Sequence, residues 1–68
     1  MPWNYLSERE REIAMLVSQG ATNKEIAREL TISIKTVKNT LTNVFEKTGL
    51  RSRTELAVEV VRYHMSAA

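Results

Sequence analysis

The pattern Ser/Thr-x-x-Glu occurs three times in this chain, each time directly before apolar residues at helical spacing. In this pattern the hydroxyl accepts a hydrogen bond from the third amide of a helix, and the Glu side chain reaches back to the amide of the capping residue. The three occurrences begin at Ser7, Thr22 and Ser52. They predict helices over about 8–19, 23–30 and 53–65.

A fourth helix is predicted over about 34–48. Ser33 is suited to cap its start, and Gly49 is suited to end it in the left-handed conformation. Its inward face repeats at i, i+4, i+7 and i+11, the period of an α-helix, and consists of Val37, Leu41, Val44 and Thr48. Since no segment alternates apolar and polar residues with a period of two, we predict an all-α fold. The 68 residues suffice for one compact four-helix domain.

The connection between the helices over 23–30 and 34–48 is only three residues long. Such a short connection makes two helices cross steeply, which is the geometry of a helix-turn-helix. Ala27 is small where the helices approach, Ile32 is apolar inside the turn, and Val37 is placed to pack back against Ala27. We therefore predict a helix-turn-helix over about 23–48.

The remaining apolar residues define the other inward faces of the core. Trp3, Tyr5 and Leu6 are expected to fold over one end of it. The positions expected to face inward are Ile13, Leu16 and Val17, then Ile26, Ala27 and Leu30, then Leu56, Ala57 and Val60.

Composition argues against several functions. The chain has no Cys and no Asp, one His and two Gly, so neither a nucleophilic thiol nor a glycine-rich phosphate loop is available. We expect no catalysis and no cofactor, and His64 lacks partners for a metal site. Apolar runs are too short to span a membrane, and the start lacks a signal-peptide pattern, so a cytoplasmic location is expected.

The positive charge is concentrated in one stretch. Although the whole chain carries a net charge of only +2, residues 31–53 contain five basic residues against Glu46 alone. The basic residues are Lys35, Lys38, Lys47, Arg51 and Arg53. A localised basic segment indicates a polyanionic partner.

The helix over 34–48 presents a polar face opposite Val37. That face carries Lys35, Asn39, Thr42 and Glu46, flanked by Thr36 and Asn43 on one side and by Lys38 on the other. Cations and short hydrogen-bonding side chains are the groups that contact phosphates and base edges. We therefore predict that the first two to three turns of this helix enter the major groove of double-stranded DNA.

Sequence motifs along most of the chain point to a known family. They are Leu6-Ser7-x-Arg9-Glu10, Gly20-x-Thr22-Asn23-Lys24-Glu25-Ile26-Ala27, Leu30-x-Ile32-Ser33-x-x-Thr36-Val37-Lys38, then Asn43, Lys47, Gly49 and Ser52-Arg53-x-Glu55. From about Leu6 to Val61 the chain resembles the DNA-binding domain of LuxR/GerE-type bacterial transcription regulators, which is also the output domain of NarL-type response regulators. The resemblance implies a four-helix domain that binds DNA as a dimer, with the third helix in the major groove.

The resemblance also assigns individual roles. It implies that Lys38, Asn39 and Thr42 face bases. It also implies that five residues lie at positions that are near DNA phosphates in the family: Asn23, Lys24, Lys35, Thr36 and Lys47. The chain departs from the family pattern at Thr40, where His is frequent, and at Thr48, where Leu is usual and where Thr is expected to weaken the inner face of the helix.

The last helix has more apolar surface than a monomer needs. Leu56, Val60, Tyr63 and His64 are expected to face the core. A second apolar group lies beside them and consists of Val58, Val61 and Met65. Because one apolar stripe suffices for a surface helix, we predict that this group forms a homodimer contact, as the resemblance also implies. The contact is small, so pairing is expected to be weak without DNA.

Two alternatives stay open on the sequence alone. The chain could be a helical protein-interaction module that has lost DNA binding, although a basic outer face argues against this. It could also be the promoter-reading helix-turn-helix of a sigma factor, although the motifs at Thr22–Ala27 and Ser52–Glu55 favour the LuxR type. The resemblance suggests a further partner, a receiver or ligand-binding domain outside these residues.

Overall fold

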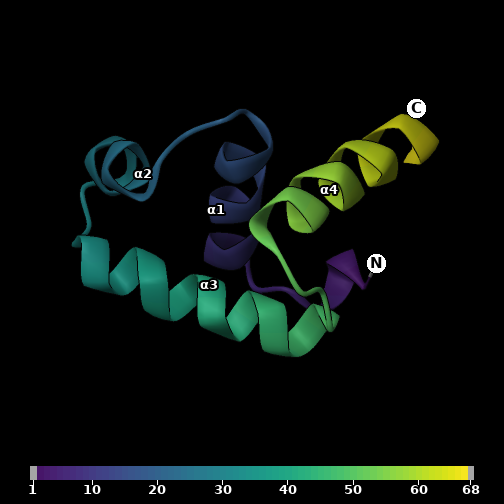
Figure 1. The fold of residues 1–68 in the computed structure, drawn as a ribbon, viewed down its shortest axis with the longest axis horizontal. Coiled ribbons are helices and arrows are strands. Elements are labelled where there is room, and N and C mark those ends of the chain that lie inside the picture. The colour runs from purple at the N-terminus through teal and green to yellow at the C-terminus, as the bar shows by residue number, and fades with distance from the viewer. Residues whose placement is uncertain (1, 68) are drawn as a thin grey trace.

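A computed structural model describes residues 2–67, and within them the chain forms four α-helices and one short 3-10 helix, with no strand (Figure 1). The elements are η1 (Trp3–Tyr5), α1 (Glu8–Ser18), α2 (Asn23–Leu30), α3 (Ile34–Thr48) and α4 (Arg53–Ala67). The predicted all-α class is confirmed, and α2 and α3 have the predicted bounds. The other two bounds differ. α1 ends one residue early because the chain turns at Gly20, whose φ is 86°, and α4 continues past Met65 because no helix-breaking residue follows it.

Local hydrogen bonds account for where the helices begin. Complete capping boxes form at Ser7 with Glu10 and at Thr22 with Glu25. At the third box, only one of the two predicted hydrogen bonds forms. The Ser52 hydroxyl accepts from the Glu55 amide at 3.0 Å, but the Glu55 carboxylate accepts from the amide of Arg51 at 3.3 Å. Ser33 caps α3 by accepting from the Thr36 amide at 3.0 Å.

The turn between α2 and α3 depends on a strained residue. Thr31 has φ 57° and ψ 48°, the left-handed conformation that glycine adopts most easily. Its amide donates to the Arg28 carbonyl at 3.4 Å, and the Ile32 amide donates to the Ala27 carbonyl at 2.9 Å. This pair of bonds is a Schellman motif, which ends α2 and turns the chain directly into α3.

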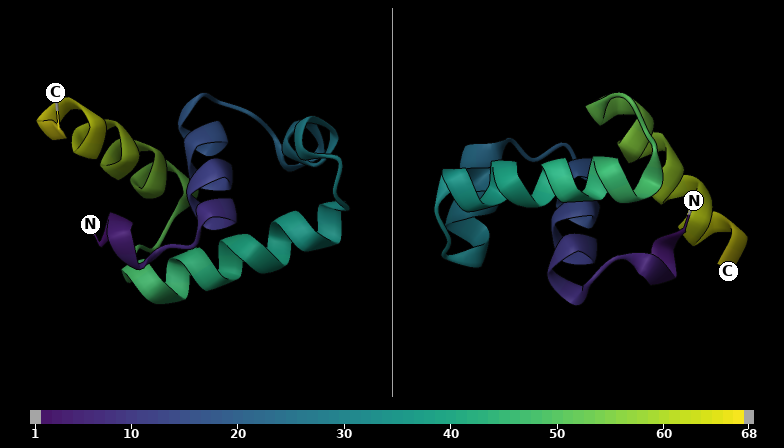
Figure 2. Two further views of the ribbon diagram at one scale, coloured as in Figure 1. Left: turned by 180° about the vertical axis from the view of Figure 1, so that it is seen from behind. Right: turned by 90° about the horizontal axis from the view of Figure 1, so that it is seen from below.

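α1 lies at the centre of the molecule and packs against each of the other three α-helices, while α2 also packs against α3 (Figures 1 and 2). α3 crosses the end of α1, so one side of α3 meets the core and the other faces solvent. The buried core contains Trp3, Leu6, Ile13, Ala14, Val17, Ile26, Ala27, Val37, Leu41, Val44, Leu56 and Val60. The residues predicted to face inward that are only half-buried are Leu16, Leu30, Thr48, Ala57 and Tyr63.

The N-terminal segment differs from the prediction in one residue. Trp3 and Leu6 cover the end of the core as expected, but Tyr5 is 77% exposed. Residues two apart in a 3-10 helix, which has three residues per turn, point to different sides, so Tyr5 cannot follow Trp3 inward. Trp3 stacks on Tyr63, with ring centroids 5.4 Å apart, and meets His64 edge-on at 5.2 Å. The sequence predicts that His64 faces the core, but His64 is exposed. Its ring contacts the core at the edge of Trp3.

Candidate nucleic-acid interface

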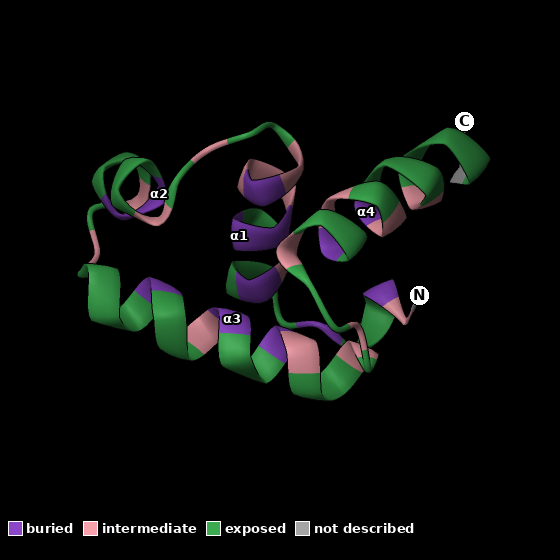
Figure 3. Cartoon of the chain, in the orientation of Figure 1, coloured by how far each residue is buried: buried purple, intermediate pink, exposed green. Residues whose placement is uncertain are grey.

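The solvent side of α3 carries the polar residues that the sequence placed there. The outer face of α3 carries the predicted DNA-contacting residues Lys35, Thr36, Lys38, Asn39, Thr42 and Asn43, all of which are exposed. Glu46 is also exposed and lies on this face near the end of the helix. The buried residues of the helix lie on the opposite side, against α1 and α2 (Figure 3). Within the described residues, this face of α3 is open to solvent and is available to enter a groove.

The charges at the start of α3 run against the usual preference of a helix. The partial positive charge at a helix N-terminus favours acidic residues there. α1 and α2 follow this rule with Glu8, Glu10 and Glu25 in their first turns, whereas α3 has no acidic residue in its first turn. Lys35 lies in that turn and Lys38 follows directly. The helix N-terminus, Lys35 and Lys38 therefore all contribute positive potential at the exposed start of α3.

Several threonine hydroxyls on α3 are already used within the helix. The Thr42 hydroxyl donates to the Lys38 carbonyl at 3.0 Å, and the Thr40 hydroxyl donates to the Thr36 carbonyl at 2.8 Å. Thr48, the second departure from the family pattern, donates to the Val44 carbonyl at 2.8 Å and accepts from the Leu50 amide at 3.3 Å. Thr48 thus helps to end the helix, a role that its predicted place on the inner face did not suggest.

Two further predicted site residues, Asn23 and Lys24, lie at the start of α2, and one of them contacts Arg53, to which the sequence analysis gave no role. Lys24 is exposed, whereas Asn23 is half-buried. The Asn23 side-chain oxygen accepts from Arg53 at 2.6 Å, and the same guanidinium donates to the Ala21 carbonyl at 2.7 Å. Arg53 thereby ties the start of α4 to the start of α2. Residues 23 and 53 are too far apart in sequence for helical spacing to reveal this contact.

Lys47 has a protein partner at the far end of α3. Its ammonium group lies 2.8 Å from the carboxylate of Glu10, which is only 6% exposed. The same carboxylate oxygen accepts from the Ser7 amide at 2.7 Å. The hydrogen bond from Lys47, helped by the one from Ser7, holds the pKa of Glu10 below its ordinary value although burial opposes this shift. Lys47, which is predicted to contact a DNA phosphate, therefore also joins α3 to α1.

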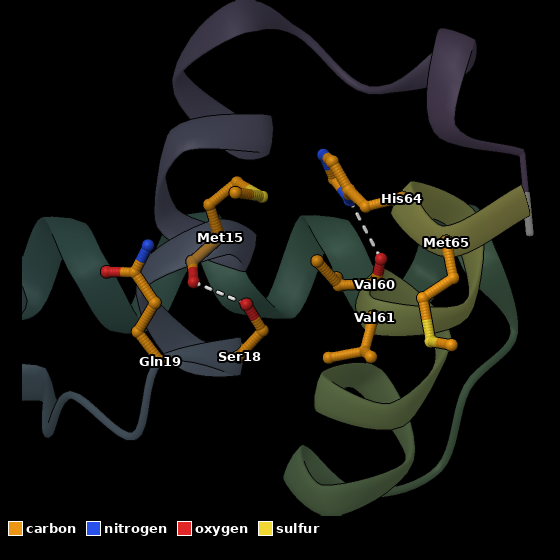
Figure 4. Close-up of a pocket in the computed structure, with 7 residues that line it drawn as sticks. All are labelled: Met15, Ser18, Gln19, Val60, Val61, His64 and Met65. Carbon is orange, nitrogen blue, oxygen red and sulfur yellow. Dashed lines mark hydrogen bonds between the residues drawn. The ribbon is translucent and has the colours of Figure 1, made fainter. Parts of the chain in front are cut away.

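The second apolar group of α4 lies at the surface. Val58 is 44% exposed, Val61 46% and Met65 73%. A groove of about 470 Å³ runs beside them between α1 and α4, with Met15 and Gln19 on one wall and Val61 and Met65 on the other (Figure 4). Val61 also lines a second hollow with Val58 and Ser18. Val61 thus lines both apolar depressions.

Comparison with known proteins decides the family. The family described as bacterial regulatory proteins, luxR family, matches residues 4–60. The chain belongs to this family. The resemblance inferred from the motifs is confirmed.

Individual relatives agree with this assignment. The chain is 46% identical over 65 residues to the transcriptional regulatory protein LiaR of Bacillus subtilis, covering 96% of this chain and 31% of LiaR. It is 47% identical over 57 residues to the spore germination protein GerE of the same organism, covering 84% of this chain and 77% of GerE. It is 52% identical over 63 residues to the monoamine regulon transcriptional regulator of Klebsiella aerogenes, covering 93% of this chain and 26% of that protein. The chain thus spans less than a third of two of these relatives.

The predicted site residues of this LuxR-family domain fall into separate groups. Six lie on the outer face of α3, while Asn23 and Lys24 lie at the start of α2 and Lys47 lies near the end of α3. The apolar residues Val58, Val61 and Met65 lie on α4, in a different part of the molecule. Within the described residues, no helix is both long and apolar enough to cross a membrane.

Proposed function

We propose that this domain binds double-stranded DNA sequence-specifically and regulates transcription, with the first two to three turns of α3 in the major groove. The observation that carries the proposal is the unbalanced positive potential at the exposed start of α3. Lys35 lies in the first turn of α3 and Lys38 follows it, while that turn, at the positive end of the helix dipole, has no acidic residue. A phosphate backbone would offset this potential, whereas a neutral partner would not.

The placement of α3 supports the same conclusion. Because a three-residue turn joins α2 to α3, α3 exposes its polar side, while its buried residues face the core (Figure 3). A helix in the major groove meets phosphates at its edges and base edges at its centre. A local charge arrangement that disfavours the isolated fold is typical of a functional site.

Within this proposal the polar residues have different roles. Lys38, Asn39 and Thr42 read base edges, and the Asn39 amide can pair with the two hydrogen-bonding groups of adenine in the major groove. Residues assigned to phosphates are Asn23, Lys24, Lys35, Thr36 and Lys47, and Asn43 supports the same face. For Asn23 and Lys47 the contact would be made while the side chain keeps its partner Arg53 or Glu10.

Selection from random duplex DNA, followed by affinity measurements, tests the proposal. Asn39→Ala should lose about 1–3 kcal/mol of binding free energy on the selected duplex and should relax the preference at one base position. Lys24→Ala is the matched comparison. It should weaken selected and random duplexes alike and reduce the salt dependence by about one phosphate contact.

Two outcomes would contradict the proposal. If no duplex is enriched over the random library, the domain does not recognise a DNA sequence, and a protein-interaction module becomes the better interpretation. If Asn39→Ala reduces affinity for selected and random duplexes by the same factor, the outer face of α3 does not read bases.

We further propose that two copies pair on DNA through Val58, Val61 and Met65 of α4. The proposal is supported by the exposure of these three side chains and by the apolar depressions on both sides of Val61. The apolar area is small, so the isolated domain should be largely monomeric, and DNA half-sites should hold two copies close enough to pair. Half-sites should then be related by two-fold symmetry.

Val61→Glu tests the pairing surface. The charged side chain should leave helicity and half-site affinity unchanged, because Val61 is 46% exposed and lies on α4, outside the proposed DNA-contacting residues. It should abolish cooperative binding to a duplex with two half-sites. Cooperative binding at the level of the unmodified domain would remove α4 from the interface.

The proposed partners beyond DNA are a second copy and a receiver or ligand-binding domain, since the chain corresponds to only part of relatives such as LiaR. The proposed place of action is the bacterial cytoplasm, where the DNA is found. The proposal assigns no catalytic step to the domain.

A further inference from the structure

Thr42 is the base-facing residue whose chemistry the structure restricts most. A threonine hydroxyl in solution can donate one hydrogen bond and accept others, so it could pair with several base edges. Here the hydroxyl lies 3.0 Å from the backbone carbonyl oxygen of Lys38. A carbonyl oxygen can only accept, so the hydroxyl must donate its single proton to the helix.

What remains of the side chain is a methyl group and the lone pairs of an oxygen held against the backbone. Of these two groups the Cγ2 methyl has the larger surface. Thr42 is exposed on the outer face of α3. In the major groove, thymine alone presents a methyl group, at C5. Burying two methyl groups against each other removes apolar surface from water and requires no hydrogen bond.

We propose that Thr42 recognises the C5 methyl group of a thymine, so that each half-site contains a thymine facing the second to third turn of α3. The inference rests on the proposed DNA binding and adds to it the kind of base pair that one residue selects. The neighbouring residues Lys38 and Asn39 are exposed and carry N–H donors suited to other bases, which gives Thr42 a distinct role among the three.

The test replaces thymine with deoxyuridine, which lacks only the C5 methyl. Each thymine of a duplex obtained by selection is replaced in turn, and the dissociation constant is measured by fluorescence anisotropy. One thymine per half-site should be sensitive, and its replacement should weaken binding about fourfold, the effect of one buried methyl-sized group.

Two substitutions at Thr42 separate its methyl from its hydroxyl. The quantity compared is the dissociation constant of the deoxyuridine duplex divided by that of the thymine duplex at the sensitive position. Thr42→Ser keeps the hydroxyl and removes the methyl, so this ratio should fall to about one. Thr42→Val keeps a methyl and removes the hydroxyl, so the ratio should persist. Both variants should keep the helical circular dichroism of the parent, since Thr42 is exposed.

Thr40→Ser is the matched control. Thr40 makes the same kind of bond, to the Thr36 carbonyl at 2.8 Å, but is half-buried and lies off the outer face. Its substitution should leave the thymine-to-deoxyuridine ratio unchanged.

The inference is overturned if no thymine is sensitive, if Thr42→Ser preserves the ratio, or if Thr42→Val abolishes it. Each of these results leaves sequence-specific binding to the selected duplex intact and so spares the proposed function. If selection enriches no duplex at all, the proposed function and this inference both fail, and the two kinds of failure are thereby distinguished.

Discussion

Replacing Glu10 with Gln should destabilise the domain through the loss of one ionic hydrogen bond. Glu10 is 6% exposed, and one of its carboxylate oxygens accepts from both the Ser7 amide and the Lys47 ammonium group. Gln also serves at the third position of a capping box, so the bond to Ser7 can persist. The substitution therefore isolates the charge that faces Lys47.

The size of the effect follows from the exposure of the two partners. A hydrogen bond to a charged group contributes about 1.5–3 kcal/mol to stability. The Lys47 side chain is 44% exposed, so water competes for its ammonium group and the lower end of that range applies. A loss of about 1.5 kcal/mol should lower the Tm of a domain of this size by about 6–12 °C.

The pH dependence of this loss has a definite sign. The Lys47 hydrogen bond, more than any other contact, lowers the pKa of Glu10 from the reference value of 4.5. A carboxyl group whose pKa is lower in the folded state stabilises the fold fully above its unfolded pKa, and this contribution is lost as the pH falls through its folded pKa. The stability difference between the parent and Glu10→Gln should be constant near neutral pH and should shrink below about pH 4.

Unfolding followed by circular dichroism at several pH values measures both quantities. Glu12→Gln is the control on the same helix, because Glu12 is 48% exposed and lies 3.8 Å from Arg9. Such a surface pair should contribute less than about 0.5 kcal/mol. Equal Tm values for the two variants would refute the reasoning, as would a Glu10→Gln difference that persists unchanged into acid.

Three further predictions concern the connections between helices. Thr31→Gly should stabilise the domain by about 0.5–1 kcal/mol, since relief of the left-handed strain at φ 57° exceeds the entropy that glycine loses on folding; a lower Tm would contradict this. Ala27→Leu should destabilise it by about 1–3 kcal/mol by overpacking the crossing of α2 and α3, and an unchanged Tm would mean that this crossing has room to spare. Arg53→Met should cost about 1–3 kcal/mol because it removes the bonds to Asn23 and to the Ala21 carbonyl; thermal unfolding would show no loss if these contacts are unimportant.

The sequence alone was sufficient to predict the helices and most of the core. Capping, helical periodicity and left-handed end residues act over three to five positions, so the bounds of α2 and α3 follow from neighbours such as Thr22, Ser33 and Gly49. The same periodicity separates the buried side of α3 from its outer face. This explains why Lys38, Asn39 and Thr42 could be placed at the solvent side before any tertiary contact was known.

The tertiary structure decided which distant residues meet. Glu10 and Lys47 are 37 positions apart, and Asn23 and Arg53 are 30 apart. Whether such side chains touch depends on the crossing angles and offsets of whole helices, which no local pattern encodes. The same is true of Trp3, whose ring stacks on that of Tyr63, 60 positions further along the chain. The bond from the Thr42 hydroxyl to the Lys38 carbonyl is local, four residues back in the same helix, but it depends on a side-chain rotamer that residue spacing alone does not fix.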